Sequence, residues 1–142
     1  MTVLFVCTGN TCRSAMAEAI ARQLAAERGL DLFFQSRGLA AAAGEPASEG
    51  ARMVAAAHMV NLLDHRAAPL TESDLANADA VYAMTGRHRD QLCADFPQWA
   101  EKIKTLCQDA DIPDPWGGDL SVFFSVYRAL HSAVGALPPL QP

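Results

Sequence analysis

The loop from Cys7 to Ser14 holds the residues of this sequence that are best suited to chemistry. Five residues separate Cys7 from Arg13, in the run Cys-Thr-Gly-Asn-Thr-Cys-Arg-Ser. The backbone N–H groups of so tight a turn converge on a small anion, and Gly9 and Asn10 tolerate the positive φ angles that such a turn needs. The guanidinium of Arg13 can bridge two phosphoryl oxygens, which a lysine ammonium cannot do. The pattern predicts a phosphate-binding loop.

Cys7 is the candidate nucleophile of this loop. The positive end of a helix that starts near Ser14 and the charge of Arg13 would stabilise a thiolate, and the Ser14 hydroxyl could donate a hydrogen bond to the sulfur. Such a thiolate can attack phosphorus in line and form a covalent intermediate. The alternative is a small buried cysteine that only packs. The glycine, asparagine, arginine and serine in register after a strand favour the functional interpretation.

A second candidate segment is Asp-Ile-Pro-Asp-Pro-Trp-Gly-Gly at residues 111–118. A cysteine-dependent phosphatase needs a proton donor for its leaving group, and Asp114 stands between two prolines that stiffen its backbone. Trp116 is a candidate wall of the substrate pocket. Taken alone, Asp114 could equally be a turn residue and Trp116 a core aromatic.

The elements that must position these residues alternate along the chain. Short apolar runs predict strands at residues 3–6, 32–36, 80–84 and 102–106. Periodic apolar residues and capping residues predict helices from Ser14 to a stop at Gly29, at 47–58, from 70, at 87–96 and at 120–137. This alternation predicts a single α/β domain over residues 1–142, with helices on both faces of a parallel sheet. Because ligands bind outside the carboxyl ends of parallel strands, we expect the Cys7 and Asp114 loops at the same sheet edge.

Charge and composition argue against several function classes. The net charge of -5 disfavours a nucleic-acid partner, and the basic run Arg87-His88-Arg89 is predicted to be a solvated helix face. The apolar runs are too short to span a membrane, and the N-terminus lacks the basic region of a signal peptide, so a cytoplasmic protein with free thiols is expected. The cysteine and histidine spacings match neither a zinc site nor a Cys-x-x-Cys redox pair, so no metal and no cofactor are expected.

Nearly the whole chain resembles the low-molecular-weight protein tyrosine phosphatase family. The resemblance rests on the run from Val3 to Ser14 and on Asp114-Pro115 followed by an aromatic residue, two motifs far apart in the sequence. Further family landmarks follow in order at Ser36-Arg37-Gly38, His65-Arg66, Leu70-Thr71 and Ala83-Met84.

The resemblance implies a flavodoxin-like three-layer sandwich with a four-stranded parallel sheet. It implies that Cys7 is the nucleophile, Arg13 the phosphate clamp, and Asp114 first the general acid and then the base. The remaining phosphate-binding residues would be Thr8, Gly9, Asn10, Thr11, Cys12 and Ser14, with Asn10, Ser14 and Ser36 bracing the loop. Cys12 matches the position whose thiol can form a disulfide with the nucleophile under oxidation. The implied partners are phosphorylated proteins as substrates and inorganic phosphate or other oxyanions as inhibitors, with no metal.

Two residues depart from the family's usual pattern. Ala15 replaces a proline that suits the first turn of a helix. Thr11 replaces isoleucine or leucine and, together with Ala83-Met84-Thr85 and His88, resembles the bacterial branch that dephosphorylates protein arginine. A hydroxyl in the pocket wall suits a guanidinium better than a phenol ring. Phosphoarginine and phosphotyrosine are therefore equally favoured as substrates. The alternative is that Thr11 only fills space in the loop.

Three other functions are compatible with such a loop. An arsenate reductase of the same fold needs cysteines that relay a disulfide, and Cys93 and Cys107 show no recognisable relay pattern. A non-catalytic phosphoprotein-binding domain would need neither Cys7 nor Asp114. A phosphocarrier domain would have no use for Asp114, which serves to protonate a leaving group and to activate water.

Overall fold

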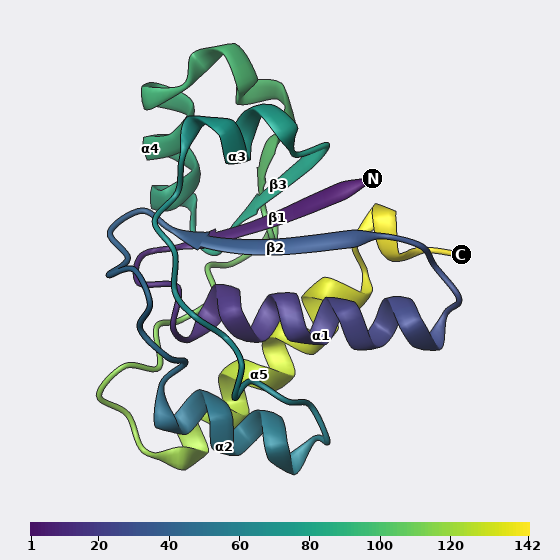
Figure 1. Cartoon of the computed structure of the whole chain (residues 1–142), viewed down its shortest axis with the longest axis vertical. Coiled ribbons are helices and arrows are strands. Elements are labelled where there is room, and N and C mark those ends of the chain that lie inside the picture. The colour runs from purple at the N-terminus through teal and green to yellow at the C-terminus, as the bar shows by residue number, and fades with distance from the viewer.

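The computed structural model describes residues 1–142 and has a four-stranded sheet at its centre (Figure 1). The strands are β1 (Thr2–Cys7), β2 (Phe33–Gly38), β3 (Ala80–Ala83) and β4 (Ile103–Thr105). All neighbouring strands are parallel, in the order β2-β1-β3-β4. The chain leaves β1 toward β2 on one side and later returns to β3 on the other, so the carboxyl end of β1 is a topological switch point. The predicted flavodoxin-like α/β fold is confirmed.

Helices cover both faces of this sheet. They are α1 (Arg13–Glu27), α2 (Glu49–Ala57), α3 (Glu72–Asn77), α4 (Gly86–Asp95) and α5 (Leu120–Gly135), with short 3-10 helices at Pro97–Lys102 and Pro138–Leu140. On one face lie α1 and α5, with α2 packed against α5, and on the other lie α3 and α4 (Figure 1). No helix is both long enough and apolar enough to cross a membrane.

The apolar run of β1 is uninterrupted because both sides of the strand are buried. Val3, Phe5 and Cys7 belong to the larger core, which α1 and α5 complete. Leu4 and Val6 belong to a smaller core that includes residues of α3 and α4. Since alternate side chains point to opposite faces of a strand, neither face of β1 can carry polar residues. Cys7 is the last residue of this central strand, so its position at the carboxyl edge is rigidly held.

Helix α1 follows the expected spacing, with one face buried and an ion pair on another. Met16, Ile20 and Leu24 are all buried, and Glu18 pairs with Arg22 at 2.7 Å, four residues on. Gly29 follows the helix with φ +69°, a left-handed conformation that favours glycine at a helix end.

Several predicted boundaries differ from the structure by a few residues. The second strand begins one residue later than predicted, at Phe33, and runs to Gly38, the last residue that pairs with β1. The helix expected from residue 47 begins at Glu49, since the Ser48 side chain accepts the N–H of Ala51 and caps it. The last helix ends at Gly135 instead of residue 137. Pro138 and Pro139, which stop it, also begin a separate 3-10 helix.

Candidate active site

The loop between β1 and α1 runs from Cys7, the end of the strand, to Arg13, the first residue of the helix. Asn10 adopts φ 57°, which lets the backbone turn sharply. Of the two loop residues that tolerate a positive φ, Gly9 and Asn10, only Asn10 adopts one. A cavity of about 280 Å³ opens over this loop, lined by Cys7 to Arg13, Asp114 and Trp116.

Two hydrogen-bonding groups converge on the Cys7 sulfur. The Asn10 N–H points to Sγ at 3.3 Å, and Ser14 Oγ lies 2.9 Å from it. The Asn10 side-chain amide donates to Ser14 Oγ at 2.9 Å. Because Ser14 Oγ already accepts this hydrogen bond, its own proton is free to point at the sulfur. Both groups can therefore donate a hydrogen bond to the Cys7 sulfur.

Asn10 also holds the loop against the segment that follows α2. Its Oδ1 accepts the Ala68 N–H at 3.0 Å, and its carbonyl oxygen lies 2.6 Å from His65 Nε2. Since a carbonyl can only accept, His65 carries its hydrogen on Nε2 in this contact. Asn10 is fully buried with both side-chain groups engaged, so it ties the loop into the body of the protein.

The Ser36 hydroxyl, expected to brace the loop, makes its hydrogen bond elsewhere. Ser36 lies in β2 beside Phe5, and its hydroxyl donates to Glu18 Oε1 at 2.6 Å. The same Glu18 pairs with Arg22, so Ser36 fastens α1 to the sheet. Its effect on the loop can only be indirect, through the position of this helix.

The segment after β4 returns to the carboxyl edge of the sheet and meets the loop. The Ile112 N–H donates to the Met84 carbonyl at 3.0 Å, which docks the segment beside β3. Arg13 is buried and donates to the Ile112 carbonyl at 3.1 Å, while its other terminal nitrogen lies 3.7 Å from Asp114 Oδ2. The expected meeting of the Cys7 and Asp114 loops is thus seen directly.

Asp114 and Trp116 stand at the mouth of the cavity. The Asp114 side chain is 57% exposed, and its Oδ1 accepts the Trp116 N–H at 3.1 Å, a short turn that orients the carboxylate. Trp116 is 81% exposed. It therefore forms part of the cavity rim and does not belong to the core.

Thr11 and Cys12 lie on the side of the loop that faces α2. The Thr11 carbonyl accepts the Ser48 N–H at 3.0 Å, and Cys12 Sγ lies 3.1 Å from Ser48 Oγ. Burial raises the pKa of Cys12 above its ordinary value of 9.0, although the hydrogen bond with Ser48 opposes this effect. All four cysteines are free, and neither Cys93 nor Cys107 lines the cavity.

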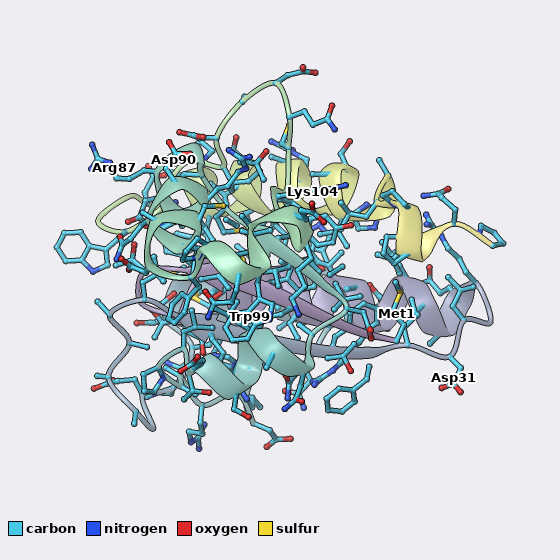
Figure 2. All side chains as sticks on the ribbon, turned by 90° about the horizontal axis from the view of Figure 1, so that it is seen from above. Met1, Asp31, Arg87, Asp90, Trp99 and Lys104 are labelled. Carbon is cyan, nitrogen blue, oxygen red and sulfur yellow. The ribbon has the colours of Figure 1, made fainter.

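His88 is the site residue that sequence reasoning misplaced. Arg87 on the same helix points outward (Figure 2), but His88 is buried and not part of a solvated face. Its Nε2 lies 2.8 Å from Thr8 Oγ1 and its Nδ1 2.9 Å from Thr85 Oγ1. Burial lowers the pKa of His88 below 6.5, and the nearby charge of Arg13 lowers it further. The sequence signal for a site residue here was the resemblance that grouped Thr85 and His88 with Thr11.

Comparison with known proteins places this chain in a family. Residues 2–139 match the family model described as low molecular weight phosphotyrosine protein phosphatase. The chain is 35% identical over 129 residues to a protein-arginine-phosphatase of Bacillus subtilis (strain 168), an alignment that covers 87% of this chain and 85% of the relative.

Solved structures agree with this result. A low molecular weight protein tyrosine phosphatase from T. tengcongensis superposes with a TM-score of 0.90 at 40% identity, covering 94% of this chain and 95% of that one. A mutant of the YwlE arginine phosphatase with a phosphorylated active site serine superposes with a TM-score of 0.91 at 32% identity, covering 94% and 91%. The family resemblance read from the motifs is confirmed, and the chain belongs to the low molecular weight phosphotyrosine protein phosphatases.

Proposed function

We propose that this enzyme hydrolyses phosphorylated side chains of proteins through a phosphocysteine intermediate on Cys7. The observation that carries the proposal is the convergence of the Asn10 N–H and the Ser14 hydroxyl on the Cys7 sulfur, at the base of a cavity that Arg13 and Asp114 also line. A phosphoryl group in this cavity would meet the loop N–H groups and the Arg13 guanidinium, which suit its oxygens.

In the first step the Cys7 thiolate attacks phosphorus, so that an S–P bond forms while the bond from phosphorus to the leaving nitrogen or oxygen breaks. Asp114, in its protonated form, gives its proton to the leaving atom. In the second step water attacks phosphorus and the Asp114 carboxylate takes a proton from it. The S–P bond then breaks, inorganic phosphate is released, and the Ser14 hydroxyl stabilises the departing Cys7 thiolate.

For the substrate we favour phosphoarginine in proteins. Thr11 lines the cavity and is half-buried, so that a hydroxyl stands in the wall where the family usually has an aliphatic side chain. A hydroxyl can accept a hydrogen bond from a guanidinium, which carries several N–H donors. The relative from Bacillus subtilis is named a protein-arginine-phosphatase, in line with this choice.

Phosphotyrosine is the second candidate. The exposed ring of Trp116 at the cavity rim offers a face on which a phenol could stack. The structural relative from T. tengcongensis is named a protein tyrosine phosphatase. The same ring can also stack on a guanidinium, so Trp116 does not discriminate between the two substrates.

The mechanism requires Cys7 as a reduced thiol, which suits a cytoplasmic protein. Inorganic phosphate and other oxyanions would occupy the loop in place of the substrate's phosphoryl group and act as competitive inhibitors. The net charge of -5 fits a protein substrate better than a nucleic acid.

The covalent mechanism is tested with Cys7→Ser. We expect this variant to lose turnover of a small aryl phosphate while still binding inorganic phosphate, because the loop N–H groups and Arg13 remain. Iodoacetate should label Cys7 faster than the other three cysteines, and phosphate should protect it. Cys93→Ser is the matched control, since Cys93 lies outside the cavity and should be dispensable. Near-normal turnover by Cys7→Ser would rule out the phosphocysteine.

A further inference from the structure

A chain of hydrogen bonds runs from the start of α4 to the phosphate loop. Thr85 caps the helix by accepting the His88 backbone N–H at 3.1 Å. The same hydroxyl oxygen lies 2.9 Å from His88 Nδ1, and His88 Nε2 lies 2.8 Å from Thr8 Oγ1. Thr8 follows the nucleophile directly and lines the cavity. The imidazole thus connects a helix cap to a side chain beside the reacting sulfur.

The partners of each group determine which atom donates and which accepts in this series of hydrogen bonds. The Thr85 hydroxyl accepts from the backbone, and its own proton has only His88 Nδ1 within hydrogen-bonding distance. Neutral His88 then accepts at Nδ1 and carries its hydrogen on Nε2, which donates to Thr8 Oγ1. Since Thr8 Oγ1 accepts this hydrogen bond, the Thr8 proton is free to turn into the cavity.

The charges around His88 are consistent with a neutral ring. Burial is the largest effect on His88 and disfavours a proton on the imidazole, as do the charges of Arg13 and Arg87. Asp111 and Asp114 favour one, and the net result is a pKa below 6.5. A neutral ring at pH 7 keeps Nδ1 as an acceptor for Thr85. An imidazolium would place a second N–H against the Thr85 hydroxyl and would require that hydroxyl to turn away.

We propose that His88 is a positioning residue that holds the Thr8 hydroxyl as a hydrogen-bond donor to a phosphoryl oxygen bound in the loop. The proposal rests on the phosphatase function above and adds to it a side-chain donor besides Arg13. Thr8 is the one that touches the ligand, and His88 acts through it. A purely structural His88, which only fastens α4 to the loop, would make no difference to Thr8 as a donor.

A double-mutant cycle separates these two roles. Thr8→Val removes the hydroxyl at nearly constant shape, His88→Phe removes both ring nitrogens, and the double variant combines them. The readout is the dissociation constant of inorganic phosphate, measured by calorimetry, which does not depend on turnover. Because hydrogen bonds to charged groups are stronger than those between neutral groups, we expect Thr8→Val to weaken phosphate binding about tenfold or more.

The cycle should be strongly non-additive. We expect His88→Phe to weaken phosphate binding in the wild-type background and to have no further effect once Thr8→Val is present. Thr8→Ser, which keeps the hydroxyl, and His88→Gln, whose amide can still donate, should recover most of the affinity. Arg89→Gln, a neighbour exposed on α4, is the control and should bind phosphate normally.

Two results would overturn the proposal. One is phosphate binding by Thr8→Val that equals wild type, and the other is an effect of His88→Phe that is equally large with and without Thr8→Val. If His88→Phe does not fold, as judged by circular dichroism, the pair Thr8→Val and Thr8→Ser still decides the role of the hydroxyl. Failure of the wild-type protein to bind phosphate would instead contradict the proposed function itself.

Discussion

Asn10 is the residue that orders the hydrogen bonds around the Cys7 sulfur. Asn10 supplies its backbone N–H to the Cys7 sulfur and its side-chain amide to Ser14, which directs the Ser14 proton to the same sulfur. One fully buried residue therefore organises both hydrogen-bonding groups at the Cys7 sulfur. The specificity of the pocket, by contrast, is expected to depend on the side chains of its wall.

Thr11 is predicted to set the choice between phosphoarginine and phosphotyrosine. Thr11→Ile removes the hydroxyl and should shift the ratio of kcat/KM values toward a phosphotyrosine peptide by at least about tenfold, which corresponds to roughly 1.4 kcal/mol. Thr11→Ser keeps the hydroxyl and should leave the ratio near that of wild type. Trp116→Ala should weaken both substrates, because the ring can stack on either. An unchanged ratio in Thr11→Ile would mean that Thr11 only packs.

Cys7 and Cys12 are predicted to form a reversible disulfide under peroxide. Four residues separate them in the loop. Peroxide oxidises Cys7 to a sulfenic acid, and the Cys12 thiolate then attacks its sulfur, which forms the S–S bond and expels hydroxide, protonated to water by the solvent. Because burial raises the pKa of Cys12 above 9.0, the rate of this capture should increase as the pH rises from 7 toward 9. Peptide mapping after mild oxidation detects the link. Cys12→Ser cannot form the disulfide and should accumulate sulfinic acid at Cys7. The same product in wild type, with Cys12 still free, would contradict the protection of Cys7 by Cys12.

At the scale of elements, the loop owes its shape to the two strands that flank its start. Gly38, the last residue of β2, pairs with Cys7 in the sheet. A Cβ at position 38 would lie 2.5 Å from the Thr8 carbonyl oxygen and 2.8 Å from the Ala41 Cβ. No side chain fits there, because the crowding atoms belong to the backbone of the phosphate loop and to the turn that covers it. The end of β2 is thus part of the site, although it contributes no chemical group.

Gly38→Ala is therefore predicted to distort the phosphate loop. The variant should lower kcat/KM for an aryl phosphate at least about tenfold, since small displacements of a catalytic loop are costly, and it should unfold at lower temperature. Gly86→Ala is the matched control, because a Cβ there would meet its nearest neighbour at an ordinary 3.8 Å. Comparable activity in both variants would show that the loop can yield to the extra methyl group.

At the scale of the whole molecule, buried titratable groups set the pH range in which the fold is stable. Burial lowers the pKa of His88 below 6.5, and burial raises the pKa of Tyr82 and of Tyr127 above 10.0. As the pH falls below 6.5 the unfolded chain takes up a proton that the folded His88 resists, so the free energy of unfolding decreases. As the pH rises above 10 the unfolded tyrosines release protons that the folded ones retain, and stability decreases again.

We predict that the melting temperature is highest between these limits and that Tyr127→Phe raises it. The Tyr127 hydroxyl is buried without a protein hydrogen-bond partner, while its ring stacks on His58 at 4.1 Å. Phenylalanine would keep the stacking and remove a desolvated hydroxyl, so a gain of about 1 kcal/mol is expected. Because Tyr127→Phe has no phenol to ionise at this position, its melting temperature should fall less above pH 10 than that of wild type. Tyr82→Phe is the comparison and should not be stabilised at neutral pH, and a lower melting temperature for Tyr127→Phe would contradict the prediction.

The sequence alone was sufficient for the fold class and for the two loops that meet at the candidate site. The apolar run before Cys7, the turn residues after it and the helix that follows are local patterns, and local patterns depend on neighbours in the chain. Two parallel strands also place their following loops at the same edge of a sheet, so the meeting of Cys7 and Asp114 followed from the order of elements.

Only the tertiary structure decided which polar groups face one another. The basic run around His88 predicts an exposed side chain. In the structure α4 packs so that the His88 ring turns inward to Thr8. Ser36 was predicted to brace the loop, but the register of β2 directs its hydroxyl to Glu18. Contacts such as these depend on the rotation of a helix and the register of a strand. Both are set by packing across the sheet, between residues that are distant in the sequence, and no local pattern encodes them.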